Sequence, residues 1–190
     1  PRVRGSSPLG RAIFKLGVNM TVVNKALIYA TNAHKGQTRK YTGEPYIVHP
    51  IEVMQTVSRV MDDPEVQAAA LLHDVVEDTP VSIKDIEDVF GLRVAALVSD
   101  LTDVSKPEDG NRATRKELDR QHTAKASPDA KTVKLADLIS NGKSIIKDDP
   151  NFAKVFMKEK AALLEVLTEG DAILFKEASD MVASYFNNRS

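Results

Sequence analysis

Apolar residues recur with a helical period along most of this chain, and that period constrains the fold more than any other feature of the sequence. The period predicts helices over residues 20–34, 50–60, 63–79, 82–90, 92–101, 127–141, 151–168 and 171–187. Residues 111–126 are predicted to form a charged helix on the surface, and residues 35–49 and 105–111 are predicted to be loops. No segment alternates apolar and polar residues strictly enough to predict a strand. We therefore expect an all-α fold built as a single helical bundle.

Residues that favour helix ends support these boundaries. The run Asp63-Pro64-Glu65 combines an N-cap, a fixed φ angle and an acid that the helix dipole favours. Ser82 and Asp85 resemble a capping box, and Gly91 is expected to end that helix. Gly142 lies within another predicted helix, where it costs about 1 kcal/mol relative to Ala. We expect it to end that helix early.

Composition narrows the classes of function. The chain has no Cys, which excludes disulfides, thiolate ligands and a Cys nucleophile, so any metal site must use His and carboxylates. The formal net charge is −1, without the basic excess that is typical of nucleic-acid binding. No apolar run approaches the roughly 18 residues of a membrane span. We expect neither nucleic acid nor a membrane as a partner, and the lack of Cys and of an export signal favours the cytoplasm.

Length and local composition suggest one domain. A chain of 190 residues can bury a hydrophobic core that is stable without disulfides or structural metal ions. Only 5% of its residues are aromatic, which favours packed helices over a β-sandwich. Residues 1–18 begin with a basic stretch rich in Pro, Gly and Ser. We predict that this segment is disordered or foreign to the native protein, and that residues 19–190 form the domain.

Four residues that could do chemistry lie close together on one predicted helix. They are His73, Asp74, Glu77 and Asp78, and the pairs four residues apart share a helix face. The preceding residues 68–72 are strongly apolar, so this part of the helix should be buried. Crowded carboxylates repel one another and are costly to desolvate there. Folding tolerates this cost when a cation or a charged ligand lies among them.

Asp137 is a second candidate, flanked by apolar residues on the helix that starts near Ser127. Asn141 lies one turn further on, and Lys134 nearly one turn back. Three interpretations are open at this point. Asp137 is a metal ligand, a partner of Lys134 in a buried ion pair, or an exposed side chain.

The loop before Pro50 supplies the third group. His49 lies where this loop meets the next helix, a place from which ligands often reach inward. Arg39 can hold a phosphate through two N–H groups, and Lys40 adds a point charge. The alternative is an ordinary solvated basic loop.

The candidate residues together form a set of nitrogen and oxygen ligands, namely His49, His73, Asp74 and Asp137. Such a set suits a divalent ion such as Mn²⁺, Fe²⁺ or Zn²⁺. Carboxylates and a metal beside a basic loop indicate hydrolysis of a phosphate ester.

Three motifs occur in order along the chain. They are His34-Lys35-Gly36-Gln37 with Arg39-Lys40 and Gly43-Glu44-Pro45-Tyr46-Ile47-Val48-His49-Pro50, then His73-Asp74-Val75-Val76-Glu77-Asp78-Thr79, then Val133-Lys134-Leu135-Ala136-Asp137 with Asn141. In order and spacing they resemble the HD-type hydrolase domain of Rel/SpoT alarmone enzymes, over residues 20–168. Because the chain has no room for the synthetase and regulatory domains of the long enzymes, it looks like a stand-alone small alarmone hydrolase, bacterial by analogy.

The resemblance implies a role for each candidate. His49, His73, Asp74 and Asp137 would bind one metal ion, typically Mn²⁺. Glu77 and Asp78 would position and deprotonate the attacking water. Arg39 and Lys40 would hold the substrate, Thr42 would replace a Ser of the family's loop after an intervening Tyr41, and Asn141 would contact the nucleoside. His34 would be structural, hydrogen-bonded near the site.

These roles imply metal-dependent hydrolysis of the 3′-pyrophosphate of (p)ppGpp, giving GDP or GTP and pyrophosphate. An HD-type phosphohydrolase acting on another nucleotide would keep the same metal ligands without preferring a 3′-pyrophosphate. An inactive alarmone-binding module would keep the binding residues without turnover. A helical protein with no site would require three ordered motifs to be accidents.

Overall fold

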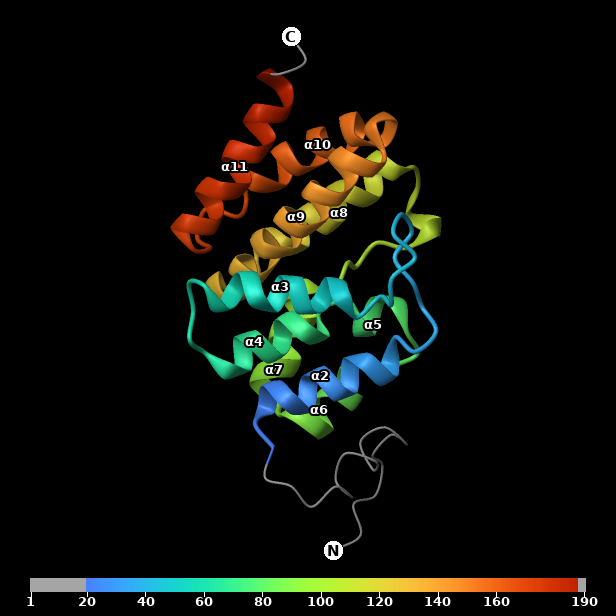
Figure 1. Cartoon of the computed structure of the whole chain (residues 1–190), viewed down its shortest axis with the longest axis vertical. Helices are drawn as coiled ribbons and strands as arrows, with labels where there is room; N and C mark the ends of the chain where they lie inside the picture. Colours follow the sequence, from blue (N-terminus) through green and yellow to red (C-terminus); the bar gives the residue numbers. More distant parts are fainter. Residues whose placement is uncertain (1–19, 188–190) are drawn as a thin grey trace, which may run out of the picture. The chain divides into compact units, whose positions relative to one another are not determined.

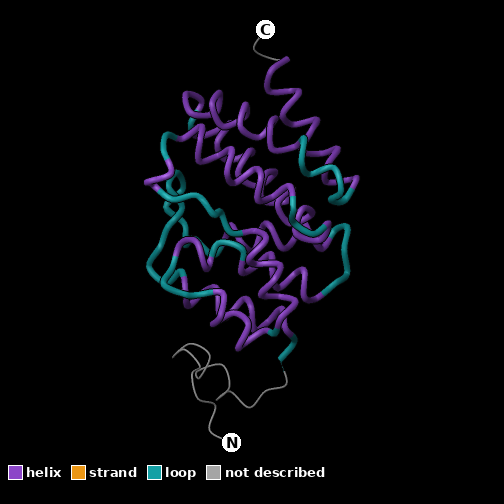
Figure 2. Tube along the Cα trace, turned by 180° about the vertical axis from the view of Figure 1, so that it is seen from behind, coloured by secondary structure: helices purple, strands orange, loops and turns teal. Residues whose placement is uncertain are grey.

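Residues 20–187 are described by the computed structural model, and all of the regular structure in this range is helical (Figures 1 and 2). The range divides into two compact units, one ending at Thr102 and the other beginning at Asp103. The expected disorder or foreign origin of residues 1–18 concerns a segment outside the described range. No helix among the described residues has the length and apolar character needed to cross a membrane.

The first unit contains six α-helices, which are α2 (Val22–Ala33), α3 (Val48–Ser58), α4 (Pro64–Leu72), α5 (Val75–Asp78), α6 (Ile83–Phe90) and α7 (Leu92–Leu101). Helix α4 is the centre of this unit, because it packs against α2, α3 and α7 (Figure 1). Its residues 68–72 have no exposed surface. The apolar run that predicted a buried helix therefore lies in the core.

The predicted capping residues of this unit are confirmed at Asp63, at Ser82 with Asp85, and at Gly91. Asp63 caps α4, since its carboxylate accepts hydrogen bonds from the backbone N–H groups of Glu65 and Val66. Ser82 and Asp85 form a reciprocal capping box at the start of α6. Gly91 ends α6 with a φ angle of 88°, in the left-handed region that favours glycine.

The helix predicted over residues 63–79 is divided, which corrects the sequence prediction. Helix α4 ends at Leu72, and the short helix α5 begins at Val75. His73 and Asp74 occupy the intervening turn, where the backbone of Asp74 has φ −94° and ψ −7°. The periodicity missed the break because both residues keep angles close to helical ones. Asp74 and Asp78 still lie one turn apart, since the Asp78 N–H donates to the Asp74 carbonyl at 2.9 Å.

The second unit contains the 3₁₀ turn η1 (Pro107–Asp109) and the helices α8 (Arg112–Ala124), α9 (Pro128–Asp148), α10 (Pro150–Leu164) and α11 (Ala172–Asn187). Helix α9 packs against α10 and α11. Ser127 caps it, as predicted, by accepting a hydrogen bond from the Ala130 N–H. The predicted surface helix α8 also contributes buried residues, Asp119 and Thr123.

The expected early end of α9 at Gly142 is wrong, because the helix continues to Asp148. A Cβ atom at Gly142 would lie 2.4 Å from Cε and 2.8 Å from Sδ of Met181 on α11. Glycine therefore admits a methionine side chain to the surface of α9. Close packing between these helices outweighs the cost of about 1 kcal/mol that glycine carries in an isolated helix.

Candidate metal centre

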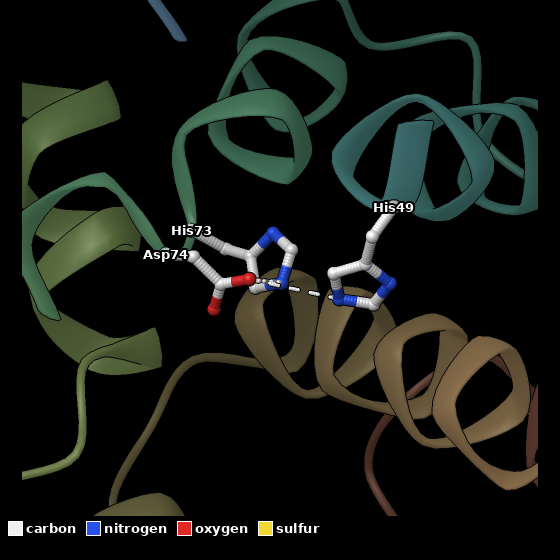
Figure 3. A group of neighbouring side chains, drawn as sticks. All are labelled: His49, His73 and Asp74. Carbon is white, nitrogen blue, oxygen red and sulfur yellow. Dashed lines mark ion pairs between the residues drawn. The ribbon is translucent and has the colours of Figure 1, made fainter. Parts of the chain in front are cut away.

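His49, His73 and Asp74 lie together in the first unit (Figure 3). Each offers one ligand atom, and these atoms all lie within 4.8 Å of one another. Asp74 Oδ2 is 3.1 Å from His73 Nε2 and 3.6 Å from His49 Nε2. Both histidines are only 3% exposed, whereas Asp74 is half-buried. The divided helix thus brings His73 and Asp74 close to His49, which lies in the first turn of α3.

The donor set of this cluster fits a divalent metal ion. His73 Nδ1 lies 2.8 Å from the carbonyl oxygen of Ala70, which can only accept, so Nδ1 carries the proton. Nε2 is the ring nitrogen that faces Asp74, at 3.1 Å from Oδ2, and in the neutral form of this tautomer it offers its lone pair to a cation. A backbone carbonyl that fixes the tautomer in this way is the usual support of a metal-binding histidine. Two imidazole nitrogens and a carboxylate oxygen suit a borderline or hard cation.

Tyr46 reaches the cluster from the loop before α3, although the sequence analysis gave it no role. Its hydroxyl donates a 2.6 Å hydrogen bond to Asp74 Oδ2. Its ring lies 4.8 Å from the ring of His34 and 6.0 Å from that of His49. A tyrosine three residues before a candidate ligand was visible in the sequence, but spacing within a loop does not predict which way a side chain points.

Glu77 and Asp78 lie on α5, directly after the cluster, and both side chains are exposed. Desolvation of the carboxyl group and the nearby charge of Asp74 raise the pKa of Asp78, against the lowering effect of Tyr46, His34 and His73. The predicted crowding of carboxylates is therefore present between Asp74 and Asp78. Their assignment to proton transfer stays a prediction.

The predicted substrate residues of the basic loop also lie in the first unit. A single antiparallel bridge pairs Thr38 with Pro45, so the segment between them forms a closed turn. The guanidinium of Arg39 donates to Glu52 of α3 at 3.1 Å. Lys40 is exposed and lies beside Tyr41, whereas Thr42 is exposed and accepts a hydrogen bond from the Glu44 N–H. The solvated-loop interpretation fits Lys40 and Thr42 better than the mostly buried Arg39.

His34 has the structural position expected for it. It is 3% exposed, and its Nδ1 lies 2.7 Å from Oε1 of Gln37. The amide nitrogen of Gln37 in turn donates to the backbone carbonyl of Asp78. His34 therefore supports the loop, through Gln37, at the end of α5.

Asp137 and Asn141 lie one turn apart on α9 in the second unit. Asp137 is 7% exposed, which excludes the exposed interpretation, and its Oδ1 accepts a 2.6 Å hydrogen bond from the Asn141 amide. Lys134 approaches Asp103 at 3.5 Å. The roles of Asp137 as a metal ligand and of Asn141 as a nucleoside contact stay predictions.

Comparison with known sequences identifies relatives across both units. A family model described as HD domain matches residues 26–162. The chain is 40% identical over 129 residues to the guanosine-3′,5′-bis(diphosphate) 3′-pyrophosphohydrolase MESH1 of Drosophila melanogaster, covering 66% of this chain and 70% of that protein. It is 45% identical over 84 residues to the bifunctional (p)ppGpp synthase/hydrolase SpoT of Escherichia coli, covering 44% of this chain but only 12% of SpoT.

Solved structures share the fold. The structure of a metazoan orthologue of SpoT, described as hydrolysing ppGpp, matches with a TM-score of 0.79 and 30% identity, covering 88% of this chain and 97% of that one. A crystal structure of a Listeria monocytogenes protein matches with a TM-score of 0.64 and 26% identity, covering 78% of this chain and 99% of that one. The predicted fold class, an all-α HD domain, is thereby confirmed for the described residues.

Proposed function

The chain belongs to the HD domain family, and from that premise we propose that it is a metal-dependent guanosine-3′,5′-bis(diphosphate) 3′-pyrophosphohydrolase. Water cleaves the bond between the ribose 3′ oxygen and the pyrophosphate of (p)ppGpp. The products are GDP or GTP and pyrophosphate. This is the activity for which its Drosophila relative is named.

The cluster of His49, His73 and Asp74 is the observation that carries this proposal. A helical domain needs no buried histidine pair beside a carboxylate for its own stability. The charge repulsion between Asp74 and Asp78 is a cost to the fold that a bound cation removes. The relatives with the same fold that are named as (p)ppGpp hydrolases then select the substrate class.

The metal-binding role falls to His49, His73 and Asp74, with Asp137 proposed as the fourth ligand and Mn²⁺ as the ion. When bound, such an ion lowers the pKa of a water molecule and neutralises charge on phosphoryl oxygens. Asp137 is buried, at 7% exposed, and the Asn141 amide donates a hydrogen bond to its Oδ1. This hydrogen bond would orient the carboxylate for metal binding.

The carboxylates of α5, Glu77 and Asp78, accept the proton of the attacking water in this proposal. Glu77 and Asp78 are exposed, so water reaches them, and Asp78 has a raised pKa. A raised pKa makes a carboxylate a stronger base near neutral pH, and a positioned base is typically worth about 10²–10⁴-fold in rate. Glu77 orients the attacking water, and the pair delivers the proton to solvent.

The loop of Arg39, Lys40 and Thr42 binds the phosphates. The Glu52 carboxylate holds the guanidinium of Arg39, so its planar N–H groups are preorganised for an anion. Lys40 adds a mobile charge from an exposed position, and Thr42 adds a hydroxyl. Asn141 contacts the nucleoside in this proposal.

A substrate panel tests the choice of substrate class. We expect the Mn²⁺-loaded protein to convert ppGpp and pppGpp much faster than GTP or GDP, which lack a 3′-pyrophosphate, and to release pyrophosphate. Release of inorganic phosphate, or equal rates on nucleotides without the 3′ group, would instead favour an HD-type phosphohydrolase of another specificity. Tight binding of ppGpp and Mn²⁺ without turnover would favour an inactive alarmone-binding module.

A further inference from the structure

Tyr46 contacts the cluster of candidate ligands through its hydroxyl group and is not itself one of the candidate ligands. Its hydroxyl donates to Asp74 Oδ2, which is also the oxygen closest to His73 Nε2. A carboxylate can rotate about its last bond and present either oxygen. A hydrogen bond to one oxygen removes part of that freedom and fixes which oxygen faces the two histidines.

The position of Tyr46 is itself fixed by packing and by backbone hydrogen bonds. Its N–H donates to the Gln37 carbonyl at 3.0 Å, and its ring lies against the ring of His34 at 4.8 Å. Gln37 is fixed in turn, because its amide nitrogen donates to the Asp78 carbonyl at 2.9 Å while its amide oxygen pairs with His34 Nδ1. The segment of the loop that carries Tyr46 is thus attached, through Gln37, to the backbone of Asp78, one turn after Asp74.

We propose that Tyr46 is a positioning residue that orients the Asp74 carboxylate for metal binding. The phenol is neutral at physiological pH, so it orients the carboxylate without adding a competing charge. Loss of such an outer contact to a metal ligand typically weakens metal affinity by about 10–100-fold. The inference rests on the metal site of the proposed function, but not on the identity of the nucleotide.

Tyr46→Phe separates this role from packing, because phenylalanine keeps the ring against His34 and removes only the hydroxyl. The experiment titrates the metal-stripped full chain with Mn²⁺ alone and measures the dissociation constant by calorimetry or by the electron paramagnetic resonance of free Mn²⁺. We expect the dissociation constant to rise about 10–100-fold. The melting temperature of the metal-free protein should stay close to that of the wild type.

Tyr41→Phe is the matched control, since it removes a hydroxyl from the same loop. The hydroxyl of Tyr41 lies 3.2 Å from the Lys40 amine rather than against Asp74. We expect this variant to keep the wild-type affinity for Mn²⁺. An equal loss of affinity in both variants would overturn the positioning role and indicate a general effect of the loop.

The metal titration contains no nucleotide, so its outcome is independent of the hydrolysis assay. Weakened Mn²⁺ binding in Tyr46→Phe supports the inference even if the wild type fails to hydrolyse ppGpp. Unchanged Mn²⁺ binding overturns the inference even if the wild type hydrolyses ppGpp rapidly. A wild type that binds no Mn²⁺ overturns the positioning role as well, whatever the hydrolysis assay shows.

Discussion

Two carboxylates, Asp78 in the first compact unit and Asp103 in the second, have opposite electrostatic surroundings. In the first unit, partial desolvation and the neighbouring Asp74 raise the pKa of Asp78. In the second unit, burial alone would raise the pKa of Asp103, but the charges of Lys134 and Lys116 outweigh it and hold the value at about 2. Ionisation of Asp78 therefore costs the fold free energy, whereas ionisation of Asp103 stabilises it.

This difference separates a site from a structural contact. Asp103 and the buried Asp119 share Lys116, and Asp119 also accepts hydrogen bonds from the N–H groups of Val104 and Ser105. These contacts offset charge or satisfy a donor. The contacts of Asp78 with Tyr46, His34 and His73 lower its pKa but do not outweigh desolvation and the charge of Asp74. This is the arrangement expected where a cation or a charged reactant completes the structure.

The largest effect is expected from Asp74→Ala. Removing the carboxylate should abolish measurable Mn²⁺ binding and lower turnover by at least about 10³-fold, because the loss of an outer contact alone costs about 10–100-fold. Calorimetry with Mn²⁺ and the rate of ppGpp hydrolysis measure the two effects. Asp88→Ala, which removes an exposed carboxylate paired with Lys84 on α6, is the control and should retain both properties. Full activity of Asp74→Ala would place the metal elsewhere.

Glu77→Gln should separate turnover from metal binding. The amide keeps the shape of the side chain but cannot accept a proton, so we expect turnover to fall about 10²–10⁴-fold. Mn²⁺ affinity should stay near the wild-type value, because Glu77 is not among the clustered ligand atoms of the described residues. Rate measurements at saturating Mn²⁺ and a metal titration test the two expectations. Full activity would show that the assigned proton-transfer role is wrong.

The paired variants Asp103→Asn and Asp78→Asn should change the free energy of unfolding in opposite directions at neutral pH. The lowered pKa of Asp103 contributes stability that is present above its usual value of 3.8 and lost as the pH falls toward about 2. Asp103→Asn should therefore cost roughly 1–2 kcal/mol at pH 7, and little below pH 2. The raised pKa of Asp78 has the reverse sign, so stability falls as the pH rises from the usual value of 3.8 to the raised pKa, and the loss persists at higher pH.

Asp78→Asn should consequently raise stability at pH 7 while lowering turnover. Urea unfolding of the metal-free proteins at pH 7 and at lower pH values measures both changes. If both variants lowered the free energy of unfolding by the same amount, the electrostatic distinction between Asp78 and Asp103 would be wrong.

The smallest effect is expected at Gly142. Alanine there gains about 1 kcal/mol of helix propensity but displaces the end of the Met181 side chain. Gly142→Ala should therefore change stability by less than about 1 kcal/mol in the wild type, and should stabilise more clearly in a Met181→Ala background. A double-mutant cycle by urea unfolding tests this coupling. If Gly142→Ala changed the free energy of unfolding equally in both backgrounds, packing against Met181 would not be the reason for a glycine at this position.

Most of the fold could be predicted from the sequence because local signals agree with tertiary packing. The caps at Asp63, Ser82 and Ser127 are local chemistry, and their helices begin where predicted. Two features were not local. The turn at His73 and Asp74 interrupts a continuous apolar pattern, and Gly142 sits inside a helix that packing against Met181 sustains.

The candidate site was predicted in part for the same reason. His73 and Asp74 are neighbours in the sequence, and His49 was recognisable from its motif. The structure shows that the three side chains lie close together. Tyr46 was missed because its role depends on the direction of a loop side chain. Asp137 and Asn141 lie one turn apart on one helix, as their spacing predicts, and their roles at the metal site stay predictions.

The most direct test of the central claim is the metal dependence of ppGpp cleavage. Metal-stripped protein is incubated with ppGpp, with and without Mn²⁺, and the products are resolved by anion exchange. We expect GDP and pyrophosphate to appear only when Mn²⁺ is present, and not with Asp74→Ala. Equal cleavage without metal, or no cleavage by a wild type that binds both Mn²⁺ and ppGpp, would contradict the assignment of a metal-dependent 3′-pyrophosphohydrolase.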